Sequence, residues 1–363
     1  MTIYLLAGGG TGGHVNPLLA LAEAIRSGEP GSEVIALGTA EGLESRLVPM
    51  RGFELQIVER LPFPRKFGGY ALAFPLKLLR AVDQICELIK VRGIEVVVGF
   101  GGYASAPAYL AAKRAKVPYV IHEANALPGL ANRLGARGAA AVAVAFPSTK
   151  LPNAVTTGMP LRLEIEDALH NANQQSARIE LGLRPDVSTL LVTGGSLGAK
   201  RINETIAKAA GTLDAAGIQV LHITGGSSEL SEVRTPDLVR IRYCDRMDLA
   251  IAAADLAVAR AGASTVCEFG AFGLPSVFVP YPIGNGEQRF NAADLVASGG
   301  AILIEDTDFD ADSVRDTVIP LISNTKELKR MREAAKKASI TDGTVRLLQL
   351  VQSVLPGYRE TDK

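Results

Sequence analysis

The sequence predicts an α/β protein built from two doubly wound parallel sheets. Short β-branched runs alternate with amphipathic stretches along the chain, and this alternation is typical of parallel strands joined by helices. The alternation starts again after residue 160, which favours a second sheet. A chain of 363 residues is long for one domain and sufficient for two.

The predicted strands follow in chain order from residue 3. They cover 3–6, 33–37, 96–98, 119–121 and 141–145 in the first half, and 189–192, 219–223, 240–243, 256–258, 276–279 and 301–304 in the second. We expect a polar loop or short surface helix over 164–177 and a last helix over 344–354. The expected domains are residues 1–160 and 161–340, with 341–363 packing back onto the first. Two such domains facing each other predict a cleft, because ligands bind outside the carboxyl ends of the strands.

The charge balance gives no support to nucleic-acid binding, since the formal net charge is zero. Residues 1–160 carry 16 Lys and Arg against 11 Asp and Glu, so an anionic surface is expected to dock on this half. The three cysteines are too few and too scattered for a disulfide framework or a zinc site, which predicts a reducing compartment. No apolar run approaches the roughly 18 residues that span a bilayer, so we expect a soluble or peripheral protein.

Three glycine-rich turns follow predicted strands, at 8–13, 99–103 and 194–198. Glycine permits positive φ and lets a ligand approach the backbone, although any one such turn serves packing as readily as binding. The first turn leads directly into a helix, whose free N–H groups and dipole favour an anion, and His14 stands at its edge. Three turns at strand ends, two in one domain and one in the other, favour a site that binds phosphates from both sides.

Residues 8–13 also match the G-x-G-x-x-G pattern of nicotinamide-dependent oxidoreductases. That site places an acidic residue at the end of the second strand, about 20 residues further on. Here the second strand ends in Ala36-Leu37-Gly38-Thr39, without a carboxylate. The sequence therefore disfavours a dinucleotide site.

A further candidate site follows the strand predicted at 256–258. Small residues at 261–265 allow a helix to start close to a ligand, and Glu268 then lies one turn into that helix. A carboxylate there accepts two hydrogen bonds from a ribose diol, whereas the alternative is a solvated or capping glutamate. Because Glu268 stands beside the Gly-Ala-Ser-Thr turn at 262–265, we favour the ribose role for it.

Together these motifs resemble the MurG family, whose members transfer N-acetylglucosamine from a UDP donor to lipid I and so form lipid II in peptidoglycan synthesis. The matching segments stand in family order over most of residues 3–340: 9–14, 101–103, 122–125, 158–162, 194–199, 262–268, and Gln288 with 291–292. The resemblance implies a GT-B glycosyltransferase with two Rossmann-like domains facing across a cleft. It implies that the N-terminal domain binds the acceptor lipid and the C-terminal domain binds the UDP-sugar.

The resemblance also implies which residues bind the donor, UDP-N-acetylglucosamine. Ser196 contacts the diphosphate, the backbone around 244–247 borders the uracil, and Glu268 holds the ribose. Gln288 and Asn125 bind the sugar hydroxyls. The implied donor set is Thr11, Gly12, Gly13, Asn125, Arg162, Ser196, Cys244, Met247, Thr265, Glu268 and Gln288.

For the acceptor, the resemblance implies that the first glycine loop faces the pyrophosphate of lipid I. The implied acceptor set is Gly9, Gly10, Gly101, Gly102, Tyr103, His122 and Asn203. Two positions depart from the family pattern. Glu287 stands where the family usually has His or Gln, which leaves the sugar contact at this position open, and Ala124 stands where Gln also occurs.

The implied reaction is an inverting displacement at the anomeric carbon of the donor sugar. The C4 hydroxyl of the muramyl sugar attacks as UDP leaves, which requires a base near the hydroxyl and positive charge near the diphosphate. His14 is our candidate base because imidazole accepts a proton near neutral pH, and Glu123 is the competing candidate. The alternative for His14 is a structural bond to a loop carbonyl. Oriented N–H groups and Arg162 meet the second need, so we expect no metal or cofactor requirement.

The segments 306–308 and 308–310 both match the D-x-D pattern of metal-dependent glycosyltransferases. They follow the last predicted strand and precede a helix expected from Asp312. Helix capping therefore explains these aspartates better than metal binding, and we predict no metal site.

The segment 60–82 is expected to contact the membrane that holds the lipid acceptor. Aromatic and leucine side chains are interleaved there with basic residues and no acidic one: Arg60, Arg65, Lys66, Lys77 and Arg80. Pro62, Pro64 and Pro75 oppose one long helix, so we predict a basic, apolar hairpin or loop-helix on anionic headgroups. The alternative is a basic helix packed on the core. The prediction is a peripheral protein on the cytoplasmic face of the plasma membrane, with cell-wall and division proteins as further partners.

Two other function classes stay open at this point. One is another GT-B enzyme, such as a glycolipid glycosyltransferase or a UDP-sugar epimerase, and the motifs at Tyr103 and 122–125 argue against it. The other is a non-catalytic UDP-sugar-binding scaffold, which the joint presence of His14, Glu268 and Gln288 disfavours.

Overall fold

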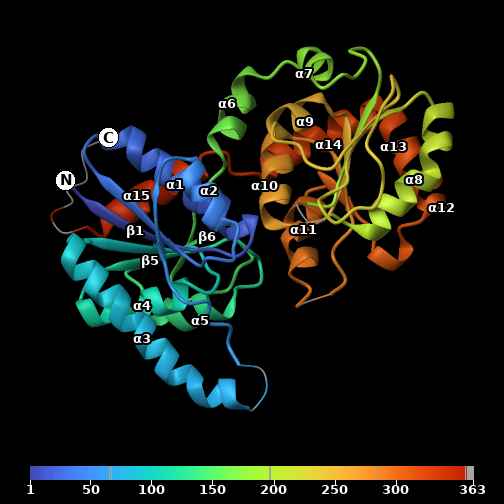
Figure 1. Ribbon diagram of the computed structural model, residues 1–363. Coiled ribbons are helices and arrows are strands. Elements are labelled where there is room, and N and C mark those ends of the chain that lie inside the picture. Colours follow the sequence, from blue (N-terminus) through green and yellow to red (C-terminus); the bar gives the residue numbers. More distant parts are fainter. Residues whose placement is uncertain (65, 67, 196–197, 284, 356, 358–363) are drawn as a thin grey trace. The chain divides into compact units, whose positions relative to one another are not determined.

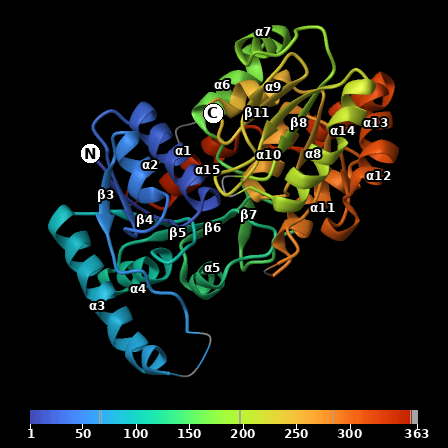
Figure 2. The same ribbon diagram turned by 45° about the vertical axis from the view of Figure 1, so that its right-hand side comes forward.

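Each half of the chain folds around its own seven-stranded sheet (Figures 1 and 2). The computed structural model describes residues 1–64, 66, 68–195, 198–283, 285–355 and 357. Unit 1 contains Met1–Arg162 and the C-terminal segment from Asp342, and unit 2 is Leu163–Thr341. The predicted α/β class with two doubly wound parallel sheets is confirmed, apart from one antiparallel pair of strands in the described part of the second sheet.

The sheet of unit 1 is parallel throughout and has the strand order β3-β2-β1-β4-β5-β6-β7. Its strands are β1 (Ile3–Ala7), β2 (Glu33–Gly38), β3 (Glu54–Ile57), β4 (Val96–Gly99), β5 (Tyr119–Glu123), β6 (Ala141–Val144) and β7 (Ala154–Thr156). Its helices are α1 (Gly12–Gly28), α2 (Glu44–Met50), α3 (Gly69–Arg92), α4 (Ser105–Ala115), α5 (Leu130–Gly135) and α15 (Gly343–Ser353).

Alternate residues of β1 divide the core of unit 1 into two layers. Tyr4 and Leu6 belong to the layer of α1 and α15, which includes Leu347, whereas Leu5 packs with Ile85 of α3 on the opposite face. The strand is therefore buried on both sides, as is usual in parallel sheets. Figure 1 shows α1, α2 and α15 over one face and α3, α4 and α5 over the other.

The strand order of unit 1 reverses between β1 and β4. The sheet continues through β2 and β3 on one side and through β5 to β7 on the other. In α/β proteins, ligands bind outside the carboxyl ends of the two central strands at such a reversal, a place that we call the β1–β4 crevice here. The glycine-rich turns at 8–13 and 99–103 are the two loops that border this crevice.

The sheet of unit 2 has the order β10-β11-β9-β8-β12-β13-β14, and only the β10–β11 pair in it is antiparallel among the described residues. Its strands are β8 (Thr189–Thr193), β9 (Gln219–Ile223), β10 (Val233–Arg234), β11 (Leu238–Ile241), β12 (Leu256–Ala259), β13 (Ser276–Phe278) and β14 (Ala301–Leu303). Its helices are α6 (Leu163–Asn171), α7 (Gln174–Glu180), α8 (Lys200–Ala215), α9 (Met247–Ala253), α10 (Ala263–Phe272), α11 (Glu287–Ala297), α12 (Ala311–Ser313), α13 (Ile319–Ser323) and α14 (Thr325–Ala338).

Unit 2 repeats the reversal, here between β8 and β12. The third glycine-rich turn follows β8, and the small-residue turn at 261–265 follows β12 and leads into α10. Ile202 and Ile206 of α8 share a buried cluster with Leu190 of β8, which seats this helix on the sheet. In each unit, the motifs found in the sequence therefore lie at the carboxyl edge of the sheet, beside the reversal of strand order.

The observed elements differ from the predicted ones mainly at the sheet edges. The strands β3, β7 and β10 were not predicted, and all three lie at an edge of their sheet, where short, partly exposed strands carry a weak hydrophobic pattern. β11 begins two residues before the predicted strand because Leu238 pairs with Val220 of β9. Residues 164–177 lie largely in two helices, α6 and α7.

α3 runs without interruption through Pro75, so the expectation that this proline opposes a helix is wrong. Pro75 lies in the second turn of the helix and is exposed. Proline has no N–H group to donate to the carbonyl one turn earlier, and that carbonyl can bind water instead. Pro62 and Pro64 precede the helix and lie in a loop. The amino-terminal part of α3 extends away from the rest of unit 1 (Figure 1).

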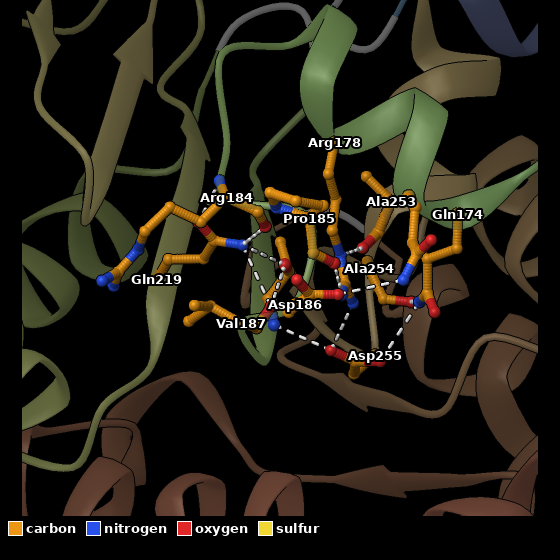
Figure 3. Close-up of polar contacts among 12 residues, drawn as sticks. Gln174, Arg178, Arg184, Pro185, Asp186, Val187, Gln219, Ala253, Ala254 and Asp255 are labelled. Carbon is orange, nitrogen blue, oxygen red and sulfur yellow. Dashed lines mark hydrogen bonds and ion pairs between the residues drawn. The ribbon is translucent and has the colours of Figure 1, made fainter.

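A buried ion pair fixes α7 to the amino-terminal edge of the sheet of unit 2 (Figure 3). Arg178 is 6% exposed, and its guanidinium lies 2.7 Å from the carboxylate of Asp255, which directly precedes β12. Its other N–H groups donate to the carbonyls of Ala253 and Pro185, at 2.9 and 2.8 Å. The Asp255 carboxylate also accepts from the backbone N–H of Thr189 at 2.8 Å, so this network joins α7, β8 and β12.

Arg178→Ala is expected to lower the free energy of unfolding of unit 2 by about 3–5 kcal/mol, because it leaves the Asp255 carboxylate without its cation. Arg184→Ala is the matched control. Arg184 pairs with Asp237, and both side chains are more than a third exposed, so this loss is expected to cost less than about 1 kcal/mol. Urea unfolding followed by circular dichroism measures both variants. Equal losses would contradict the role given to the buried pair.

Candidate functional site

Two glycine loops pack directly against each other at the β1–β4 crevice of unit 1. Gly10 has a φ of 90° and Gly102 a φ of 80°, a region that favours glycine. A Cβ on Gly102 would collide with the carbonyl oxygen of Gly9. A Cβ on Gly101 would lie 3.0 Å from Nε2 of His14. The four glycines and the histidine predicted at this edge are therefore brought together on one surface.

His14 is held at this surface by a hydrogen bond to the backbone. Its Nδ1 lies 3.0 Å from the carbonyl oxygen of Gly9. A carbonyl only accepts, so Nδ1 carries the hydrogen, and the neutral ring has its lone pair on Nε2. Nε2 faces Gly101, and the side chain is half-buried. The hydrogen bond to the Gly9 carbonyl therefore orients the imidazole so that Nε2 can accept a proton at the crevice.

Thr11, Gly12 and Gly13 form the entry to α1 beside this surface. Thr11 is exposed and precedes the helix in an extended conformation, without a capping hydrogen bond from its side chain among the described residues. The first-turn N–H groups of a helix have no partner within the helix. Those of Gly12 and Gly13 therefore provide an anion-binding position at the positive end of the α1 dipole.

Glu123, the competing base, is 2% exposed and its carboxylate is fully engaged. Oε1 accepts from the backbone N–H of Asn125 at 2.9 Å and from its side-chain amide at 3.4 Å. Oε2 accepts from the backbone N–H of Gly129 and from the amide of Asn132, both at 2.9 Å. Four donors occupy both oxygens, so the carboxylate holds the 124–129 loop in place and offers no free lone pair to a substrate hydroxyl.

Asn132 and Tyr109 belong to this network, although the sequence analysis did not single them out. Asn132 is 1% exposed, and its amide also donates to the carbonyl of His122 at 3.2 Å. Its Oδ1 accepts from the Tyr109 hydroxyl at 2.7 Å, and burial raises the pKa of that hydroxyl well above its usual value. The sequence carries no local signal for either residue, because only the fold brings Gly99 and Gly135 so close to the Tyr109 ring that a Cβ on either would collide with it.

His122 does not line the crevice, which corrects the acceptor contact implied for its side chain. The imidazole is fully buried, and its centroid lies 5.6 Å from that of the Phe100 ring. Its Nε2 lies 3.3 Å from the carbonyl oxygen of Gly158. Burial lowers its pKa to about 4, so the ring is neutral at neutral pH. The residue ties β5 to the turn at Gly158.

Tyr103 connects the second glycine loop to the basic segment 60–82. The Arg60 guanidinium lies over the Tyr103 ring at 4.8 Å from its centroid, and its Nη2 is 3.5 Å from the hydroxyl. Tyr103 is half-buried beside Gly102. This stacking contact joins the edge of the crevice to the start of the segment that was expected to meet the membrane.

In unit 2, the turn after β8 includes Ser196, which lies outside the described residues. Its neighbour Gly198 has a φ of 85°, and a Cβ there would collide with the Thr224 carbonyl. Asn203 is 4% exposed, donates to the same carbonyl at 2.8 Å and accepts from Nε2 of His222 at 3.0 Å. Both polar atoms of this buried amide have protein partners between α8 and the end of β9, which corrects the acceptor contact implied for the side chain.

The turn after β12 places two of the implied donor residues on α10. Gly262 precedes the helix, Thr265 is half-buried in the first turn, and Glu268 is 6% exposed in the second. Arg260, 8% exposed, donates to the carbonyls of Val279 and Pro280 at 3.0 Å, and so fixes the strand end opposite this turn. Arg260 was not among the predicted site residues.

The aspartates of the D-x-D matches have protein partners. Asp306 lies 2.6 Å from the Arg260 guanidinium and 3.2 Å from that of Arg201. Asp310 caps α12 by accepting from the backbone N–H of Ser313 at 2.9 Å, as helix capping predicts. Within the described part of the chain, no three or more His, Cys, Asp or Glu side chains gather as a metal-binding group.

The remaining implied donor residues lie on both units. Gln288 is in the first turn of α11, and its Oε1 accepts from the backbone N–H of Tyr281 at 3.0 Å. Cys244 is buried in the turn before α9, and Met247 begins that helix. Asn125 and Arg162 are half-buried and belong to unit 1, whereas Cys244, Met247 and Gln288 belong to unit 2.

The comparisons with known proteins cover both units. Residues 4–144 match the glycosyltransferase family 28 N-terminal domain, and residues 189–347 match the glycosyltransferase family 28 C-terminal domain. A curated relative from Leifsonia xyli subsp. xyli, the UDP-N-acetylglucosamine--N-acetylmuramyl-(pentapeptide) pyrophosphoryl-undecaprenol N-acetylglucosamine transferase, is 56% identical over 98% of this chain and 99% of its own. The protein of the same name from Clavibacter sepedonicus is 55% identical over 98% and 97%.

A solved structure is similar over the whole chain as well. The crystal structure of Acinetobacter baumannii MurG matches with a TM-score of 0.75 and 27% identity, covering 98% of this chain and 100% of that one. The two family matches fall one in each unit. The chain therefore belongs to the MurG family of glycosyltransferases, within glycosyltransferase family 28.

Proposed function

We propose that this glycosyltransferase moves N-acetylglucosamine from UDP-N-acetylglucosamine to the C4 hydroxyl of the muramyl sugar of lipid I, with inversion at the anomeric carbon. The product is lipid II, a precursor of peptidoglycan. The observation that carries the proposal is the orientation of His14, whose Nδ1 is bound to the Gly9 carbonyl so that Nε2 faces the crevice of unit 1. The names of the full-length relatives support the same substrates.

In this proposal unit 1 receives the acceptor, with its sugar against the first glycine loop. The Gly10 N–H donates to the Glu44 carboxylate at 2.7 Å, and Glu44 is fully buried behind the loop. A carboxylate there opposes a second anion at Gly9 and Gly10. We therefore place the neutral muramyl sugar, rather than the pyrophosphate, against these two residues. The N–H groups of Gly12 and Gly13 remain for the donor diphosphate.

The proposed chemistry needs one base. As the C4 hydroxyl oxygen bonds to the anomeric carbon, its proton passes to Nε2 of His14. The bond from that carbon to the β-phosphate oxygen breaks, and UDP leaves with the electron pair. Glu123 is assigned a different task, because its engaged carboxylate holds the loop that presents Asn125 to the donor sugar.

Unit 2 is the proposed donor site. Glu268 in the second turn of α10 binds the ribose diol, and Gln288 binds hydroxyls of the sugar. Cys244 and Met247 border the uracil. The positive end of α10, beside Thr265, stabilises the diphosphate as it leaves, together with Ser196 and Arg162, so the proposal requires no metal ion or cofactor.

Release of UDP from UDP-N-acetylglucosamine, with and without a soluble lipid I analogue, tests the function. UDP is expected to appear only when the analogue is present, because the sugar has no other acceptor in this site. UDP release that does not depend on the analogue is the result expected of an epimerase or a hydrolase, and it would contradict the proposal. Absence of release under both conditions would leave a binding scaffold and would contradict it equally.

In the same assay, His14→Gln is expected to lower kcat about 10²- to 10⁴-fold, the contribution typical of a positioned general base. The KM for UDP-N-acetylglucosamine is expected to change little, because the donor binds mainly to unit 2. His170→Gln, which alters an exposed histidine of α6, is the control. A loss confined to KM would mean that His14 only binds.

We also propose that the protein is a peripheral enzyme on the inner face of the plasma membrane, attached through residues 60–82. Exposed apolar side chains gather along the loop and α3: Phe63, Tyr70, Leu72, Leu76 and Leu79. Leu72 is 83% exposed, which is costly for a leucine that meets only water. No helix in the described ranges has both the length and the hydropathy to cross a bilayer. A basic, apolar edge suits anionic headgroups.

Flotation with liposomes that contain anionic lipid tests the attachment. Replacing Arg65, Lys66, Lys77 and Arg80 by Glu is expected to abolish flotation, because attraction to the anionic surface becomes repulsion. The control reverses four exposed lysines of α14 in unit 2: Lys326, Lys329, Lys336 and Lys337. Its flotation is expected to equal that of the unaltered protein. Equal flotation of both variants would sink the proposal.

A further inference from the structure

Glu44 is a fully buried carboxylate that no step of the proposed reaction uses. It begins α2 and is 0% exposed. Oε1 accepts from the N–H and the hydroxyl of Thr39, both at 2.8 Å, and Oε2 accepts from the N–H of Gly10 at 2.7 Å. Within the described ranges, no Lys, Arg or His side chain pairs with it. Burying an unpaired carboxylate is costly, so this arrangement needs a physical reason.

Three glycines from separate turns make room for the Glu44 side chain. A Cβ on Gly9, Gly38 or Gly42 would collide with it. Gly9 belongs to the loop after β1, Gly38 ends β2, and Gly42 lies just before α2. The backbone is thus shaped around the carboxylate from three sides, and the carboxylate is aimed at the first glycine loop.

The two hydrogen bonds at this loop meet in a single peptide group. The Gly10 N–H, which Glu44 binds, and the Gly9 carbonyl, which Nδ1 of His14 binds at 3.0 Å, belong to the same peptide. Hydrogen bonds on the two ends of one amide strengthen each other, because each polarises the group that makes the other. A carboxylate at the N–H end therefore makes the Gly9 carbonyl a better acceptor for His14.

We propose that Glu44 is a positioning residue for His14 and acts on it through the Gly9–Gly10 peptide. This inference rests on the proposed function, in which His14 is the base. The Glu44 carboxylate holds the plane of the Gly9–Gly10 peptide. The Gly9 carbonyl then keeps the imidazole hydrogen on Nδ1, so that the lone pair of Nε2 faces the acceptor hydroxyl. When Nε2 takes the proton of the attacking hydroxyl, the ring becomes positive, and the carbonyl bond to Nδ1 strengthens in the transition state.

Glu44→Gln tests the inference, because the amide keeps one acceptor oxygen for the backbone N–H donors of Gly10 and Thr39, and the carboxyl charge is lost. We expect kcat to fall about 10- to 100-fold, a loss of the size that follows when the outer hydrogen-bond partner of a metal-bound histidine is removed. The KM for UDP-N-acetylglucosamine is expected to stay within about twofold of its original value. Glu23→Gln is the control: Glu23 is also nearly buried in unit 1, but it pairs with Arg51 away from the loop.

A double-mutant cycle with His14→Gln separates positioning from a general loss of structure. If Glu44 acts through His14, adding Glu44→Gln to the His14→Gln protein lowers kcat no further. Additive losses, or a kcat of Glu44→Gln within twofold of the unaltered enzyme, would overturn the inference. A His14→Gln protein with full kcat would instead remove the base on which the proposed function depends. Circular dichroism and donor binding check folding, and Glu44→Asp, which withdraws the carboxylate by one methylene, replaces Glu44→Gln if that variant does not fold.

Discussion

The hydrogen bond between Nδ1 of His14 and the Gly9 carbonyl depends on one peptide group being held still. Two glycines in succession, with a positive φ at Gly10, leave a free backbone many orientations. Here the Gly9–Gly10 peptide is bound by Glu44 at its N–H and contacted by Gly102 at its carbonyl. The orientation of the His14 ring therefore depends on a contact behind the loop. The three donors to the Glu44 carboxylate offset the cost of burying it.

The two units share one topology. In each, the strand order reverses at the centre of the sheet, and the turns that the sequence singles out lie at the carboxyl ends of the two central strands. One buried ion pair, Arg178 with Asp255, lies at the opposite, amino-terminal edge of the sheet of unit 2. This division leaves the turns free to carry glycine and unusual backbone angles, because the strands and helices beneath them supply the stability.

The sequence could predict the sheets and the glycine turns because both leave local patterns. Buried parallel strands are short apolar runs, and a turn that needs positive φ selects glycine, as at Gly10 and Gly102. The roles of Glu44, Tyr109 and Asn132 could not be predicted, because each depends on a partner far away in the chain. For the same reason His122 matched a family motif, yet only the fold determines that its ring faces the interior. Edge strands such as β3 were missed because they lack the apolar run that indicates a central strand.

The position of the hydrogen on the His14 ring tests the central claim most directly. The protein has four histidines, so ¹⁵N-labelled imidazoles give few signals, and the His14→Gln protein assigns the one that disappears. In the neutral ring, the account predicts a protonated Nδ1 and an unprotonated Nε2, because the Gly9 carbonyl can only accept. A neutral ring with its hydrogen on Nε2 would contradict the account, since no lone pair would then face the acceptor hydroxyl.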